Sequence, residues 1–236
     1  MQVGVFAKTF AGIEPLAVLM ACKNAGFDCV QYNMSCSGLD VLPNNIHEEV
    51  AAKVLKASLA TGIRIAAISA TYNMTDPDLT RRAAGRAAFT VIAKRASAMG
   101  SKMLTVCSGS MDPKNKWQHH TANKEPANWT RMCREFEVIC GIAESHGLFI
   151  GVEPESANIV SSAEHAADLL KTFAGGPIRI VFDPANIIEN VESEDHNHVI
   201  EKAFDLLGPM IGLAHAKDRS SDGRVAPAGK GVVDWT

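Results

Sequence analysis

The stretch HGLFIGVEPE, residues 146–155, carries the pattern that decides the fold. Gly147 stands where a preceding helical segment would end, because glycine readily adopts the left-handed conformation that closes a helix. A continuous apolar run follows and ends at an acidic residue, Glu153. This order predicts a β/α repeat: a helix that ends at a glycine, then a strand that ends at a polar residue. Because the strand is apolar throughout and does not alternate with polar residues, we expect it to be covered on both faces.

The same order recurs along the chain. Similar joints of glycine and apolar strand stand at Gly26, Gly62, Gly100, Gly175 and Gly208. Together with QVGVFA (2–7), they predict seven strands. Helical patterns fill the intervals, roughly at 14–25, 45–61, 78–98, 128–145, 162–174 and 195–207, with a cap expected at Ser161 or Ser162. Strict alternation of strands and helices predicts an α/β fold with a parallel sheet.

The strand ends favour a closed barrel over an open sheet. Polar residues stand at or just after six of the predicted strands: Gln31, Asn73, Ser108, Glu153, Asp183 and His215. A barrel collects such residues at one mouth, where its active site lies. An open nucleotide-binding sheet would carry G-x-G-x-x-G after its first strand, whereas QVGVFA leads into KTFAGIEP (8–15).

We therefore predict a (β/α)8 TIM barrel that forms a single domain over residues 1–236. Seven strands do not close an eight-stranded barrel, and the sequence ends at GKGVVDWT (229–236). We expect the last β/α unit to be missing from this chain.

Composition narrows the class of protein. The net charge is −3, which argues against a nucleic-acid partner, and no apolar run approaches the roughly 18–20 residues of a membrane span. The N-terminus lacks the basic and apolar regions of a signal peptide. None of the six cysteines forms a C-x-x-C pair, which indicates reduced core thiols and predicts a cytoplasmic protein.

Three consecutive strand ends carry side chains that can bind a metal ion: Glu153, Asp183 and His215. Each residue alone is more often a helix cap, a salt-bridge partner or a structural histidine. Neighbouring parallel strands lie about 4.8 Å apart, so these three side chains should converge. Two carboxylates and one imidazole suit a divalent ion such as Mg²⁺, Mn²⁺ or Co²⁺, with Zn²⁺ also compatible.

Four short motifs stand at or after these strand ends: VEPE (152–155), FDPAN (182–186), HAKD (215–218) and GKGVVDW (229–235). With these motifs the chain resembles the xylose isomerase-like TIM-barrel superfamily, which includes sugar phosphate isomerases, ketose 3-epimerases and hydroxypyruvate isomerases. The resemblance implies that Glu153, Asp183 and His215 are metal ligands. It also implies a fourth ligand, a second glutamate on the eighth strand, beyond Thr236.

The resemblance further implies an isomerase or epimerase that acts on a sugar, a sugar phosphate or a small hydroxy-ketone. Such enzymes remove a proton beside a carbonyl, and the metal stabilises the resulting enediolate. Glu153 is then both ligand and base. Asn186 stands where ketose 3-epimerases carry a histidine, and Gln31 stands where they carry a glutamate, which weakens that particular label.

Further candidates surround these ligands. Asn186 and Gln31 could bind a sugar hydroxyl, while Lys217 and Arg219 could bind a phosphate or carboxylate, or lie in a solvated loop with Asp218. Ser108 and Glu155 complete the predicted substrate contacts. The polar loop from 107 to about 127 is a candidate lid, and its two histidines, His119 and His120, are either functional or simply exposed. Trp117 and Trp129, which bracket much of this loop, are either an apolar wall of the pocket or packing anchors.

Three alternatives remain open on the same fold. A multi-zinc DNA-repair endonuclease would need several strand-end histidines and a basic groove, and only His215 among eight histidines ends a strand. A sugar-binding barrel without catalysis would lack the second base. A lyase or dehydratase would use the same metal-enediolate chemistry. A small carbohydrate is the expected partner in each non-nuclease reading, and a homo-oligomer is compatible with all of them.

Overall fold

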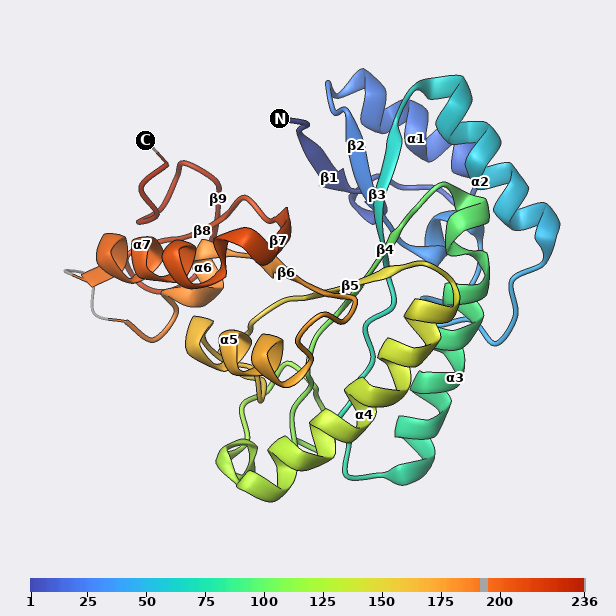
Figure 1. Cartoon of the computed structure of the whole chain (residues 1–236). Helices are drawn as coiled ribbons and strands as arrows, with labels where there is room; N and C mark the ends of the chain where they lie inside the picture. Colours follow the sequence, from blue (N-terminus) through green and yellow to red (C-terminus); the bar gives the residue numbers. More distant parts are fainter. Residues whose placement is uncertain (192–194, 236) are drawn as a thin grey trace. The chain divides into compact units, whose positions relative to one another are not determined.

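The computed structural model describes residues 1–191 and 195–235 (Figure 1). Seven strands follow one another in the main sheet in chain order: β1 (Gly4–Phe6), β2 (Cys29–Tyr32), β3 (Arg64–Ser69), β4 (Met103–Val106), β5 (Phe149–Val152), β6 (Ile178–Phe182) and β7 (Ile211–Ala214). The helices between them are α1 (Pro15–Asn24), α2 (Glu48–Thr61), α3 (Leu79–Ala96), α4 (Pro126–Ser145), α5 (Ala163–Thr172), α6 (Pro184–Ile187) and α7 (His196–Leu207). This alternation matches the predicted α/β fold class.

The chain divides into two compact units, which are described separately. Unit 1 comprises residues 1–72, 80–106 and 138–150, and unit 2 comprises residues 73–79, 107–137 and 151–236. The single-domain assignment stays a prediction. None of the helices in the described ranges is long and apolar enough to cross a membrane.

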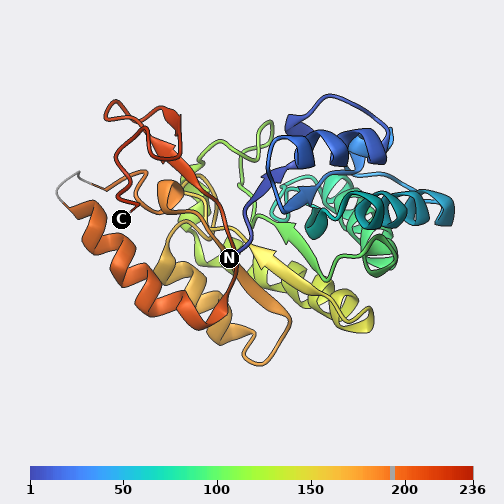
Figure 2. The same cartoon turned by 90° about the horizontal axis from the view of Figure 1, so that it is seen from above.

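Unit 1 contains the first four strands, and β1 pairs in parallel with β2, β2 with β3, and β3 with β4. The register places Val5 opposite Val30 and Ile68 opposite Leu104. Helices α1 and α2, which also belong to unit 1, pack side by side (Figures 1 and 2). The continuous apolar runs become a core in which Ile68, Leu104 and Phe89 of α3 have no exposed surface.

Unit 2 contains the parallel pair of β6 and β7, in which Phe182 lies opposite Ala214. Helices α5 and α7 pack against each other (Figure 2), and the Phe204 ring of α7 lies 4.2 Å from that of Phe182. A short antiparallel hairpin follows β7, formed by β8 (Lys217–Arg219) and β9 (Val225–Pro227). The sequence pattern did not predict this hairpin, because three-residue strands give no periodic signal.

Most of the predicted helix ends agree with the structure. Gly62, Gly100 and Gly147 adopt positive φ values at the ends of their helical segments, and Ser162 caps α5 by accepting a hydrogen bond from the His165 backbone N–H at 3.3 Å. The prediction for Gly208 was wrong. Its φ is −44°, because α7 continues directly into a short 3-10 helix over Gly208–Met210 and needs no left-handed residue there.

Candidate metal centre

The three predicted metal ligands converge in unit 2. Glu153, Asp183 and His215 each follow the last residue of a strand, after β5, β6 and β7. One potential ligand atom from each side chain lies within 4.8 Å of the others, so the three residues form a group able to hold a metal ion. Parallel pairing places successive strand ends at one edge, which explains why residues far apart in sequence meet there.

Hydrogen bonds fix the orientation of these side chains. His215 Nδ1 lies 3.2 Å from Glu153 Oε1, and the Asn186 side-chain amide donates to the same oxygen at 2.9 Å. The Asn186 backbone N–H donates to Asp183 Oδ1 at 3.1 Å, since Asp183 is the N-cap of α6. Asn186 therefore links both carboxylates, which is more than the sequence pattern assigned to it.

Asp183 supplies the clearest sign that the group fits a cation. Its carboxylate is 1% exposed, and within the described residues Oδ2 has no hydrogen bond of normal geometry. Lys217 Nζ lies 2.9 Å from Oδ2 and also contacts Asn186 Oδ1. A buried carboxylate oxygen directed at a positive charge can bind a divalent ion in the same direction.

The charges in this group depend on one another. Burial acts to raise the pKa of Glu153, but the hydrogen bond and charge of His215, together with the charge of Lys217, outweigh burial and leave the pKa below its usual value. Burial acts to lower the pKa of His215, and Glu153 raises it above its usual value. For Asp183 burial prevails over Lys217, so its pKa is raised. Glu153 and His215 therefore each favour the charged form of the other across their 3.2 Å contact.

Glu155 lies half-buried two residues after Glu153. Burial, reinforced by the negative charge of Glu153, raises the pKa of Glu155 to about 7. Its carboxyl group is thus protonated for part of the time at neutral pH and can act as a hydrogen-bond donor as well as an acceptor.

Two other predicted contact residues, Arg219 and Ser108, form hydrogen bonds or ion pairs within the protein. Arg219 binds the Glu189 carboxylate at 2.6 Å and the Ala185 carbonyl oxygen at 2.9 Å. The Ser108 side chain is fully buried and accepts a hydrogen bond from the Val160 N–H at 2.8 Å. These contacts favour structural roles for both residues.

Gln31 belongs to unit 1. It is 8% exposed and donates to Ser69 Oγ at 3.1 Å and to Thr105 Oγ1 at 2.8 Å. These hydrogen bonds join the ends of β2, β3 and β4, and they give Gln31 a structural function within its own unit.

Asparagine side chains form hydrogen bonds with the backbone of the loop after β4, the predicted lid. Asn158 accepts from the Gly109 N–H at 2.8 Å, and Asn123 accepts from the Met111 N–H at 2.8 Å. Gly109 has a φ of +80°, and a Cβ atom there would lie 2.1 Å from Asn73 Oδ1, so only glycine fits. The sequence pattern did not identify these asparagines, because amides in loops are common and carry no spacing signal.

Asp218 is another residue whose function the sequence pattern missed. Its side chain has no exposed surface. Five N–H groups donate to its carboxylate at 2.8–3.2 Å: the backbone N–H groups of Arg219, Gly229, Gly231 and Val233, and the Trp235 indole. Asp218 therefore holds the segment 229–235 beside β8, the strand that carries Lys217.

The fold and the converging ligands define a class of protein. The chain matches the xylose isomerase-like TIM barrel family over residues 19–236 and belongs to that family. The (β/α) barrel fold class is thereby confirmed. A comparison with curated proteins finds no significant match.

Among solved structures, several similar chains share this fold. The 3-keto-D-glucoside 4-epimerase YcjR from E. coli has a TM-score of 0.74 and 16% identity, covering 99% of this chain and 84% of its own. The probable 3-DHS dehydratase AsbF from Bacillus anthracis has a TM-score of 0.76 and 14% identity, covering 100% and 86%. A xylose isomerase-like TIM barrel protein from Mycobacterium smegmatis, in complex with magnesium, has a TM-score of 0.70 and 13% identity, covering 99% and 83%.

Proposed function

We propose that this protein is a metal-dependent isomerase or epimerase of a small carbohydrate or hydroxy-ketone. The observation that carries the proposal is the convergence of Glu153, Asp183 and His215 within 4.8 Å at three successive strand ends. Membership of the xylose isomerase-like family and the presence of an epimerase among the similar structures support it. The magnesium complex of a similar barrel supports a divalent ion, and Mg²⁺, Mn²⁺, Co²⁺ and Zn²⁺ are all compatible with these donors.

Glu153, Asp183 and His215 would hold the ion. A bound divalent ion supplies Lewis-acid polarisation, which stabilises negative charge that develops on substrate oxygens. Asp183 can direct its buried Oδ2 toward the ion, and Asn186 holds both carboxylates in place through its side-chain and backbone N–H groups.

Glu153 is the proposed base. Its lowered pKa keeps the carboxylate charged, so it can take the proton from the carbon beside the substrate carbonyl and return it to one face of that carbon or to its neighbour. Lys217 and Glu155 are the proposed contacts for substrate oxygens, because both side chains lie in the electrostatic field of the ligand group and retain exposed surface.

The test combines metal analysis of the full-length protein with solvent-deuterium exchange. Candidate ketoses and hydroxy-ketones are incubated in deuterium oxide, and deuterium at the carbon beside the carbonyl is followed by NMR. We expect a stoichiometric divalent ion and exchange into at least one substrate. Glu153→Gln should slow exchange at least about 100-fold, whereas Glu144→Gln, on the exposed face of α4, should leave it unchanged.

The outcomes separate the alternatives. Absence of both metal and exchange would refute the isomerase proposal, and sugar binding without exchange would indicate a sugar-binding barrel. Loss of water from the substrate would indicate a dehydratase. This alternative is considered because one of the similar solved structures is a probable dehydratase. A cytoplasmic location fits the proposal, because all six cysteines are free thiols and five of them are buried.

A further inference from the structure

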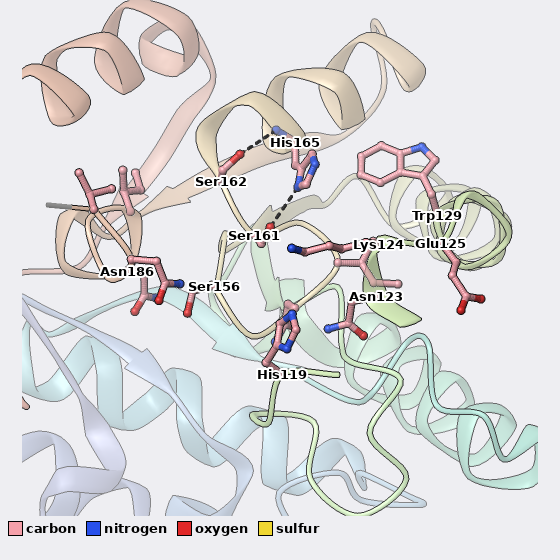
Figure 3. A pocket seen from close by; sticks show the side chains of 15 residues that line it. His119, Asn123, Lys124, Glu125, Trp129, Ser156, Ser161, Ser162, His165 and Asn186 are labelled. Atoms are coloured by element: carbon pink, nitrogen blue, oxygen red, sulfur yellow. Dashed lines mark hydrogen bonds between the residues drawn. The ribbon is translucent and has the colours of Figure 1, made fainter. Parts of the chain in front are cut away.

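A cavity of about 630 Å³ lies within unit 2, between the loop after β4 and the start of α5 (Figure 3). Cavities of about 300–1,000 Å³ enclose ligands the size of a small drug. The volume of this cavity lies within that range. Asn123 and Asn158 line the cavity and also tie down the loop, so its wall is already formed in the free protein.

The cavity adjoins the metal centre through Asn186. The side chain of Asn186 lines the cavity and donates to Glu153 Oε1 at 2.9 Å. In Figure 3, Asn186 and Trp129 lie on opposite sides of the view. The wall of the cavity and the group of proposed metal ligands therefore share one side chain, which places the cavity next to Glu153.

The far wall of the cavity is aromatic. Trp129 lies with its ring centre 5.8 Å from that of His165, and the imidazole is held by Ser161 Oγ at 3.1 Å. Ile159, Ile187 and Val191 add apolar surface, and Ser156 and Asn190 add neutral hydrogen-bonding groups. This mixture suits a molecule with hydroxyl groups at its edges and C–H groups on its faces.

The charges around the cavity do not favour an anion. Lys124 and Glu125 line it with opposite charges. Backbone N–H groups in the first turn of α5 already have acceptors within the protein. Ser162 Oγ accepts from the His165 N–H, and the Glu164 carboxylate interacts with its own backbone N–H. A phosphate would therefore meet the single positive charge of Lys124 offset by the negative charge of Glu125, and a helix N-terminus that already has an N-cap.

We propose that this cavity is a subsite for a second, non-reacting sugar ring, so that the substrate is a neutral glycoside or disaccharide. The inference rests on the proposed function, since it places the reacting ring at Glu153. Trp129 contacts the face of the second ring, and the side chains of Ser161 and Asn190 contact its hydroxyl groups.

Binding by titration calorimetry and saturation-transfer NMR tests the subsite. The probes are D-glucose, D-glucose 6-phosphate, cellobiose, maltose and lactose. At least one disaccharide should bind at least tenfold more tightly than glucose. Trp129→Ala should reduce this preference to less than threefold, and Trp117→Ala, a matched change at an exposed tryptophan outside the cavity lining, should preserve it.

A second variant guards against misfolding of Trp129→Ala. Asn190 is exposed at the cavity, so Asn190→Trp fills the space with little effect on the core, and it should abolish the disaccharide preference. Equal binding of glucose and all disaccharides overturns the subsite, and so does tighter binding of glucose 6-phosphate. The subsite and the proposed reaction fail separately, because Glu153→Gln should lose deuterium exchange and keep the disaccharide preference.

Discussion

At the scale of single residues, Lys217 and a divalent ion would compete for the same carboxylate. Lys217 Nζ lies 2.9 Å from the buried Asp183 Oδ2. Removing this positive charge from a partly buried site should therefore increase the affinity for a cation. We predict that Lys217→Met binds Mn²⁺ about tenfold more tightly, equal to about 1.4 kcal/mol, and loses substrate affinity.

Calorimetric titration with Mn²⁺ measures this change. Lys202→Met is the matched control, because Lys202 pairs with the exposed carboxylate of Glu164 at 2.7 Å instead. Unchanged or weaker Mn²⁺ binding by Lys217→Met would show that the lysine does not compete with the ion.

Asp218 should act on stability rather than on chemistry. Burial acts to raise the pKa of Asp218, but the N–H groups of Val233 and Arg219 and the Trp235 indole hold it below its usual value of 3.8. Because the folded pKa is lowered, the stabilisation is complete well above pH 3.8 and is lost as pH falls through the folded pKa. We predict that Asp218→Asn costs about 3 kcal/mol at neutral pH.

Urea unfolding at pH 7 and at successive pH values below 4 measures this cost. The difference between Asp218→Asn and the wild type should shrink as the pH falls. A difference that is small at pH 7, or constant over this range, would contradict the role assigned to the charged carboxylate.

At the scale of elements, the segment after β9 leaves no room for a side chain at Gly231. A Cβ atom on Gly231 would lie 2.0 Å from the Arg219 carbonyl oxygen, which is a backbone atom and cannot rotate away. Beyond it, Val233 packs in a small cluster with Ala185 and Ile188 of the α6 region. We predict that Gly231→Ala destabilises the protein by about 2 kcal/mol or more.

Gly208→Ala is the matched control in the same unit. Gly208 has a helical φ of −44°, and no atom lies within 4 Å of its hypothetical Cβ. The Gly208→Ala variant should unfold at a urea concentration equal to or higher than that of the wild type, because alanine loses less conformational freedom on folding than glycine does. If both variants unfold alike, then the contact at Gly231 is not restrictive.

The elements differ in how far the sequence predicts them. The strands β5, β6 and β7 and their polar ends were predictable, because continuous apolar runs and the residue after each run are local features of the chain. The environment of Asp218 was not, because its partners Gly229 to Trp235 lie 11–17 residues away in a segment without periodicity. The hydrogen bonds that Asn123 and Asn158 form with the loop after β4 were not predictable for the same reason, because their partners are distant in sequence.

At the scale of the whole molecule, the proposed metal ligands all belong to unit 2. An ion that binds only the folded site at 100 times its dissociation constant adds about 2.7 kcal/mol of stability. Because unit 1 contributes no ligand, this gain should be confined to unit 2. We therefore predict that saturating Mn²⁺ or Mg²⁺ slows amide exchange in β6 and β7 and leaves β1 to β3 nearly unchanged.

Hydrogen exchange read by mass spectrometry, with and without the ion, resolves the two units in one experiment. Asp183→Asn removes the buried ligand and should abolish the protection in β6 and β7. Because cooperative unfolding propagates through whatever elements unfold together, equal protection of all seven strands would mean that the two compact units open as one. Protection confined to unit 2 would instead show that the metal centre stabilises the part of the chain that carries it, and that β1 to β3 open independently of the site.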